Sequence, residues 1–487
     1  MFQDHADDFQ TNFEREYYDN KVLPGVAEVI RVGPGRSVRG IDFVLGTAIP
    51  GHPLIEGAAH PVNTPDPVGP YVVEAYISDD GGISSAELVY QVDGGPVQSL
   101  PFERKLGSLY AAEIPGKPPG TVLEYRILAS DAEGKQTYLP TEDLPKLRFE
   151  VLSLSGDPLL YVALRRSRVL SVVDTGPGRE VARIPTGETP LSVGLTPDGK
   201  YVFVANTGSA TMADNRVTVV ETATHRVAAT IRVGQAPLDL AVAPDGSRVY
   251  VTNSRSQSIS VIDVESLQES RRFNVTTGGE GPFGIAVSPD GKRLYVTDID
   301  GKEVLFIDSE SGGILQRVTV EGTPRSLAVS DDGSTLYVAG FDGGISIVDT
   351  AGGEQVETIN TGSANVFRLI LSPDESTLYA SDRLNARLLV VDLGRSRVVS
   401  AVSSLSQGRE TRDLALSPDG SLIYVANQDS NDLVFFDAES LNIVKTLELT
   451  DGPRGIAVGR PPMGPEPPSE MVSQADFDGS GRIDFGD

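Results

Sequence analysis

The hydrophobic pattern of this chain becomes periodic at about residue 156. From there to about residue 459, short apolar runs alternate with tight polar turns. The clearest landmark is a turn of the form Ser-Pro-Asp-Gly, which occurs six times. Its copies are spaced 42 to 47 residues apart and end at Gly199, Gly246, Gly291, Gly333, Glu375 and Gly420. This period is typical of the four-stranded blades of a β-propeller, which span roughly 40–50 residues.

Each repeat is predicted to hold four strands. The first precedes the turn, as in Phe283–Val287, and the second follows it, as in Tyr250–Asn253. The third ends in Asp, as in Ser260–Asp263, and the fourth is of the type Val227–Val233. Continuous β-branched and aromatic runs indicate strands buried on both faces, as packed blades require. Pro, Asp and Gly in the turn supply a fixed φ, a self-bonding carboxylate and tolerance of positive φ.

The order of these strands predicts how the ring closes. The series opens with a second strand near Leu160 and closes with a first strand at 454–459. The last segment must therefore complete the blade begun at 159–163, which leaves no free sheet edge. We predict an all-β fold in which a seven-bladed β-propeller over 156–459 is preceded by an immunoglobulin-like β-sandwich.

These repeats resemble the YVTN-repeat family of seven-bladed propellers, whose name-giving motif stands here at Tyr250–Asn253. The resemblance covers about 300 residues and every repeat. It implies the fold strongly and the function only weakly, because one fold carries many functions; propellers of this family are often binding or surface-associated proteins of prokaryotes.

A separate β-domain is predicted over residues 70–153. Its strand candidates alternate apolar and polar residues and are separated by Gly-rich turns; they are Tyr71–Ile77, Ala86–Gln91, Leu109–Ile114, Leu123–Ala129 and Leu147–Val151. The segment resembles the immunoglobulin-like or fibronectin-III-like spacers of bacterial extracellular proteins, which position other domains.

The segments around these domains are shorter. Residues 46–69 are rich in Pro and predict a linker, and residues 1–45 resemble the end of a carboxypeptidase-regulatory-like β-domain. No signal-peptide pattern follows Met1, and Asp487 falls within a motif, so we expect the chain to be a segment of a longer protein. The resemblance to extracellular modules leads us to expect a location outside the cell or on its surface.

A Pro-rich linker at 460–475 leads to a calcium-loop motif at 476–487. Oxygen ligands at alternate positions of a tight turn converge on one hard cation; here they are Asp476, Asp478, Ser480, the backbone carbonyl of Arg482, Asp484 and Asp487. The motif resembles dockerin-type loops, which occur in pairs with helices, whereas this segment carries one loop. We expect Ca²⁺ as its cofactor.

Composition narrows the choice of partner. The formal net charge is -27, from 68 Asp and Glu against 41 Lys and Arg, which argues against a nucleic-acid partner. The chain has no Cys, so disulfides and thiolate chemistry are excluded. No apolar run approaches the roughly 18 residues of a membrane span.

Four arginines are candidate ligand-binding residues at the propeller mouth. Arg325, Arg412 and Arg454 occupy the position after the aligned Pro of the first strand, and Arg368 lies one further on. Such a cluster could hold a carboxylate or a sulfated sugar by bidentate bonds. The alternative, which the acidic sequence favours, is neutralisation by nearby acids, namely Asp239, Glu280, Glu410 and Asp413.

The sequence gives little support for an enzymatic function, and we assign no catalytic residue. Lactonase-type propellers show Pro-Arg-His at the inner strand, but here Ser326 and Gly455 follow the arginines. The propeller holds one histidine, His225, at an outer turn, so the usual general base is missing. A lyase or glycosidase that uses two carboxylates stays an open alternative, although the sequence identifies no particular pair. Asp-rich turns such as Asp298–Gly301 are interpreted as turn formers.

We therefore expect an extracellular or cell-surface binding or adhesion protein that holds a protein or glycan ligand at the propeller face. The alternative is an accessory or catalytic component of extracellular polysaccharide degradation, which the dockerin-like loop suggests. A propeller lactonase is a weaker alternative.

Overall fold

The computed structural model describes residues 52–59, 63–141, 145–209, 213–275, 279, 281–363, 365–404, 410–449 and 451–459. Segments 1–45, 460–475 and 476–487 lie outside these residues, so the carboxypeptidase-regulatory-like domain, the second linker and the calcium ligands stay predictions. The described part is built of strands, with one short 3-10 helix, η1 (Leu393–Arg395).

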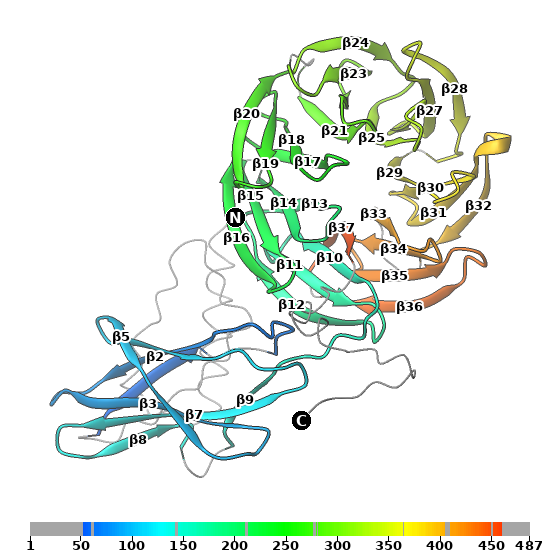
Figure 1. Cartoon of the computed structure of the whole chain (residues 1–487). Coiled ribbons are helices and arrows are strands. Elements are labelled where there is room, and N and C mark those ends of the chain that lie inside the picture. Colours follow the sequence, from blue (N-terminus) through cyan, green and yellow to red (C-terminus); the bar gives the residue numbers. More distant parts are fainter. Residues whose placement is uncertain are drawn as a thin grey trace, which may run out of the picture.

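Seven four-stranded antiparallel sheets form a ring over residues 159–459 (Figure 1). From the innermost to the outermost strand, the first three blades are β37 (Pro453–Gly459), β10 (Leu159–Leu164), β11 (Val169–Asp174) and β12 (Arg179–Pro185); β13 (Pro190–Leu195), β14 (Tyr201–Gly208), β15 (Ala213–Glu221) and β16 (Arg226–Arg232); and β17 (Pro237–Val242), β18 (Arg248–Asn253), β19 (Ser258–Asp263) and β20 (Gln268–Asn274).

The remaining four blades follow the same order. They are β21 (Pro282–Val287), β22 (Arg293–Asp298), β23 (Glu303–Asp308) and β24 (Ile314–Thr319); β25 (Pro324–Val329), β26 (Thr335–Gly340), β27 (Gly344–Asp349) and β28 (Glu354–Asn360); β29 (Val366–Leu371), β30 (Thr377–Asp382), β31 (Arg387–Asp392) and β32 (Arg397–Ser403); and β33 (Thr411–Leu416), β34 (Leu422–Asn427), β35 (Asp432–Asp437) and β36 (Ile443–Glu448).

The ring closes as the strand order predicts. The last strand, β37, pairs antiparallel with β10, the first strand of the propeller, with Leu160 opposite Val458. Leu160 also shares a buried cluster with Tyr424 and Phe435 of the seventh blade. The first and last blades therefore join through both backbone pairing and side-chain packing, which closes the ring.

The Pro-Asp-Gly turns hold the first and second strands of a blade together. In the third copy, Ser288 Oγ donates to Asp290 Oδ1 at 2.6 Å, and the backbone N–H of Lys292 donates to the same oxygen at 3.1 Å. Gly291 has φ +72°, a conformation that glycine adopts without a Cβ penalty. These bonds explain why the turn recurs at this position of successive repeats.

Two sheets precede the propeller. One has the order β1 (Leu54–Ala59), β2 (Tyr71–Ser78), β6 (Leu109–Ile114), β5 (Glu103–Leu106), and the other the order β4 (Gln98–Pro101), β3 (Ile83–Val92), β7 (Val122–Asp131), β8 (Gln136–Leu139), with β9 (Leu147–Glu150) also paired to β7. They share one core that includes Ile55, Val73, Leu88, Tyr125 and Phe149. The predicted strands are confirmed, whereas the immunoglobulin-like class stays a prediction.

The linker predicted at 46–69 needs a correction. Strand β1 lies inside it and pairs with β2, with Ile55 opposite Ile77. The surrounding Pro residues made this short apolar run look like a linker. Its Ile55 is fully buried in the core. No helix in the described part of the chain has the length and apolar character needed to cross a membrane.

Candidate functional site

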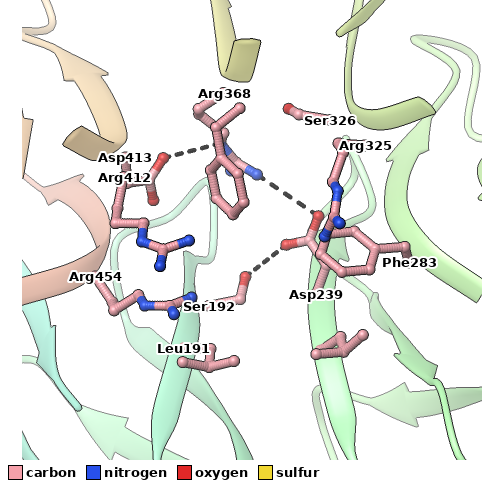
Figure 2. A pocket seen from close by; sticks show the side chains of 12 residues that line it. Leu191, Ser192, Asp239, Phe283, Arg325, Ser326, Arg368, Arg412, Asp413 and Arg454 are labelled. Atoms are coloured by element: carbon pink, nitrogen blue, oxygen red, sulfur yellow. Dashed lines mark hydrogen bonds and ion pairs between the residues drawn. The ribbon is translucent and has the colours of Figure 1, made fainter. Parts of the chain in front are cut away.

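One pocket lies at the centre of the ring, and the innermost strands of all seven blades line it (Figure 2). Each strand contributes its second residue, and five also contribute the third. The lining residues are Leu191, Ser192, Leu238, Asp239, Phe283, Arg325, Ser326, Phe367, Arg368, Arg412, Asp413 and Arg454. The cavity volume is about 60 Å³, several times the space that one water needs.

A recurring backbone irregularity places these residues in the pocket. In every innermost strand, the pairing register with the second strand shifts at this point, as it does between Pro324 and Leu327 in β25 and between Thr411 and Asp413 in β33. Such a bulge bends the strand and re-aims its side chains. The residues after the aligned Pro position therefore converge on the axis.

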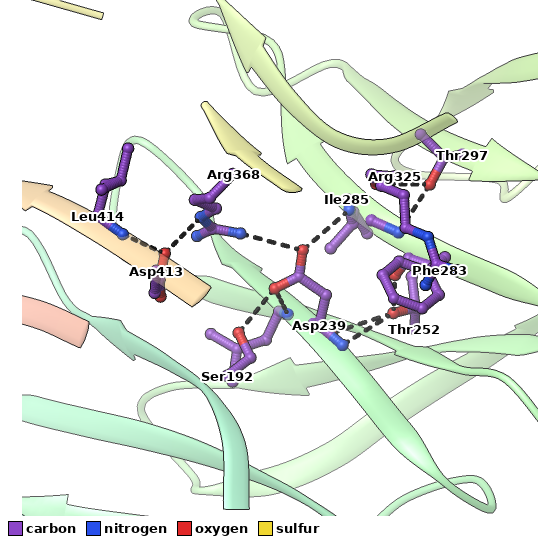
Figure 3. Close-up of polar contacts among 12 residues, drawn as sticks. Ser192, Asp239, Thr252, Phe283, Ile285, Thr297, Arg325, Arg368, Asp413 and Leu414 are labelled. Carbon is purple, nitrogen blue, oxygen red and sulfur yellow. Dashed lines mark hydrogen bonds and ion pairs between the residues drawn. The ribbon is translucent and has the colours of Figure 1, made fainter. Parts of the chain in front are cut away.

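Arg368 connects blades across the pocket (Figure 3). Its Nε lies 2.9 Å from Asp413 Oδ1, and its Nη1 lies 3.6 Å from Asp239 Oδ2. Asp239 also accepts a hydrogen bond from Ser192 Oγ at 2.7 Å, and Asp413 accepts one from the backbone N–H of Ile456 at 3.0 Å. Asp413 raises the pKa of Arg368. These two acids are therefore engaged by the protein itself.

Arg325 lies between two aromatic rings. Its guanidinium carbon is 4.6 Å from the centroid of Phe283 and 4.7 Å from that of Phe341. A planar guanidinium stacks well on aromatic faces while its edge stays available for hydrogen bonds. The two rings therefore fix the side chain in the wall of the pocket.

Arg412 is held by one ring and one acid. Its guanidinium carbon lies 5.1 Å from the centroid of Phe367, and its Nη2 lies 2.5 Å from Glu410 Oε2. Glu410 also forms an ion pair with Arg383, so two arginines share one carboxylate. Burial, followed by repulsion from Arg383, lowers the pKa of Arg412 to about 10.

Arg454, on the adjacent strand β37, has an uncharged partner. Its Nε donates to Gln428 Oε1 at 2.5 Å, and Gln428 Nε2 in turn donates to Glu410 Oε2 at 2.8 Å. Burial, and then the nearby Arg412, lowers the pKa of Arg454. Among the described residues, no carboxylate forms an ion pair with Arg454. Figure 2 shows Arg412 and Arg454 side by side at the wall of the pocket.

A comparison with protein-family models identifies the family of this propeller. The model of the family described as YNCE-like beta-propeller matches residues 150–458. The chain belongs to this family. None of the curated proteins matches it.

Solved structures share the propeller fold. A putative 6-phosphogluconolactonase from Bacteroides uniformis is 20% identical, with a TM-score of 0.53, and the match covers 62% of this chain and 100% of that one. The periplasmic gluconolactonase PpgL of Pseudomonas aeruginosa is 22% identical, with a TM-score of 0.52 and coverages of 63% and 99%. A functionally unknown protein from Desulfotomaculum acetoxidans is 18% identical, with a TM-score of 0.54 and coverages of 62% and 99%. At these identities the likeness extends to the fold alone.

The four arginines predicted from the sequence all line the pocket of this YNCE-like propeller. Neutralisation by acids is confirmed for Arg368, which both Asp239 and Asp413 engage. For Arg412 it is confirmed in part, because Glu410 is shared with Arg383. Glu280, the fourth predicted counter-ion, lies outside the described residues.

The sequence interpretation missed several residues of the site. The pocket lining includes Ser192, Phe283 and Phe367. Gln428 Oε1 accepts a hydrogen bond from Arg454 Nε. Phe283 and Phe367 share the aligned position after Pro with the arginines, and Ser192 lies one position further on, whereas Gln428 follows β34 and shares no such position.

Other candidates lie away from the pocket. Asp298 Oδ1 accepts a bond from the backbone N–H of Gly301 at 3.0 Å, in keeping with a turn-forming role. His225 lies in the turn between the outer strands β15 and β16, where its ring stacks on Tyr161 with centroids 6.4 Å apart.

Proposed function

We propose that this YNCE-like propeller is a binding module whose central pocket takes an acidic group of a glycan or protein ligand. The pocket lining carries four arginines against two aspartates, an excess of positive charge in a chain of formal net charge -27. The observation that carries the proposal is the Arg412–Arg454 pair, because Glu410 is its one carboxylate partner among the described residues. An anionic ligand would supply the missing charge through charge-assisted hydrogen bonds.

The pocket chemistry favours binding over catalysis. In the described part of the chain, its lining contains no histidine, and both of its aspartates are engaged by Arg368. The likeness of residues 70–153 to extracellular spacers supports an extracellular or cell-surface location as part of the proposal. A role in polysaccharide degradation stays the alternative, and it rests on the calcium-loop motif at 476–487.

The test is isothermal titration calorimetry with neutral, uronic-acid and sulfated oligosaccharides. Wild-type protein is expected to bind acidic ligands and not neutral ones. Replacing Arg412 and Arg454 together with Ala should weaken binding at least tenfold, because each lost charge-assisted bond contributes about 1.5–3 kcal/mol. The matched control is Arg397→Ala, on the exposed outer strand β32, which should leave affinity unchanged.

Two results would contradict this proposal. One is acidic-ligand binding that survives in the double variant. The other is hydrolysis of gluconolactone by the wild type that the double variant loses, which would favour the lactonase alternative instead.

A further inference from the structure

We infer that the pocket recognises the end of its ligand, with one terminal carboxylate seated between Arg412 and Arg454 in competition with Glu410. This inference rests on the proposed function, since it concerns the same pocket. Three features carry it: the size of the cavity, the excess of positive charge around the pair, and the bonds of Glu410.

The cavity is too small for the middle of a polymer. A volume of about 60 Å³ accommodates a few water-sized groups, whereas drug-sized ligands occupy pockets of roughly 300–1,000 Å³. The pocket therefore suits one small end group, with the rest of the ligand outside it.

Positive charge accumulates on one side of the pocket. Arg412, Arg165 and Arg383 all act to lower the pKa of Arg454, after the larger effect of burial, whereas Glu410 acts to raise it. Asp413, on the same strand as Arg412, is bound to Arg368. Glu410 is shared between Arg383 and Arg412, and no carboxylate of the described residues forms an ion pair with Arg454, so a bound anion would reduce the excess of positive charge.

Glu410 indicates the chemistry that the arginines accept. Its Oε2 lies 2.5 Å from Arg412 Nη2 and accepts from Gln428 Nε2 at 2.8 Å, while its Oε1 pairs with Arg383. A planar carboxylate therefore already satisfies part of Arg412. The Nε of Arg412 is buried and has no hydrogen-bond partner among the described residues, so the arginine has a donor left for a second carboxylate.

A second buried polar atom lies across the pocket. Ser326, on β25, is 5% exposed, and its Oγ has no hydrogen-bond partner in the described part of the chain. Figure 2 shows Ser326 on the opposite wall from Arg454. A hydroxyl or carbonyl group next to the ligand's carboxylate would pair with this Oγ, and we therefore assign the seated group as a small polar carboxylate, such as the carboxylate end of a terminal uronic acid.

Two substitutions of opposite charge test the role of Glu410. Glu410→Gln removes the resident negative charge while keeping a similar shape, and it should tighten the binding of D-glucuronate about tenfold. Gln428→Glu places a new carboxylate beside Arg454 Nε, and it should weaken that binding by a similar factor. The probes for calorimetry are D-glucuronate, its methyl ester, acetate and inorganic sulfate, and thermal unfolding checks that both variants are folded.

Each outcome decides the inference. Tighter binding in E410Q with weaker binding in Q428E, and no binding of the methyl ester, supports it. Weaker binding in E410Q would overturn it and make Glu410 a positioning residue for Arg412, with the proposed function intact. Sulfate binding without glucuronate binding would overturn the carboxylate assignment alone, whereas loss of every anion would overturn the proposed function as well.

Discussion

Arg368 Nε lies 2.9 Å from Asp413 Oδ1, on the neighbouring innermost strand. The same guanidinium reaches Asp239 on β17, three blades away, at 3.6 Å. Asp413 is buried and Asp239 is partly buried; Asp239 accepts a hydrogen bond from Ser192 Oγ, and Asp413 accepts one from the backbone N–H of Ile456. One side chain thus joins blades that are not adjacent in the ring and connects them to the closing strand.

Removing this connection should destabilise the propeller. Arg368→Met leaves the buried Asp413 and the partly buried Asp239 without their cation, which we expect to lower the free energy of unfolding by about 3–5 kcal/mol. Urea denaturation measures the change. Arg317→Met, which breaks an exposed ion pair with Glu303, is the control and should cost about 0–1 kcal/mol. Equal losses in the two variants would contradict the bridging role.

Close approach of innermost strands leads to a second prediction. A Cβ added at Gly455 of β37 would lie 2.5 Å from Leu191 O and 3.0 Å from Val193 N, both backbone atoms of the next blade. We expect Gly455→Ala to force strands apart and to lower the free energy of unfolding by about 1–3 kcal/mol. The control is Gly313→Ala in an exposed turn, where the nearest atom is a serine side chain at 3.3 Å. If both variants unfold at the same urea concentration, β37 does not set the closure of the ring.

The propeller could be predicted because the same local sequence signals recur in successive blades. Each turn of the type Ser288–Gly291 marks one blade, and the phase of the series places β37 beside β10. Strand β1 could not be predicted in the same way, since the segment around its buried Ile55 is rich in Pro and matches no repeat.

The sequence predicts where the candidate site lies, but it does not predict which acid pairs with which arginine. Alignment placed the four arginines at the mouth, because they share one offset from the Pro position. Which arginine has its own acid depends on contacts across the ring, such as Arg368 with Asp239, and no local pattern encodes them. The neutral partner of Arg454, Gln428, directly follows the second strand of a neighbouring blade, β34, where no repeat motif indicates a pocket residue.

The last prediction concerns the pH dependence of stability, which we attribute in part to His225. The ring is buried, 7% exposed, and burial lowers its pKa to about 4, against 6.5 in the unfolded chain. Below pH 6.5 the unfolded chain takes up a proton that the folded chain does not, so the stabilisation present at neutral pH is lost as the pH falls toward 4. Between pH 7.5 and pH 5 the loss from this group should be about 2 kcal/mol. His225→Asn does not titrate, and Asn tolerates the φ of +54° found here. Urea denaturation at both pH values should therefore show a smaller pH-dependent loss in H225N than in the wild type, and an unchanged loss would mean that His225 is protonated in the folded propeller.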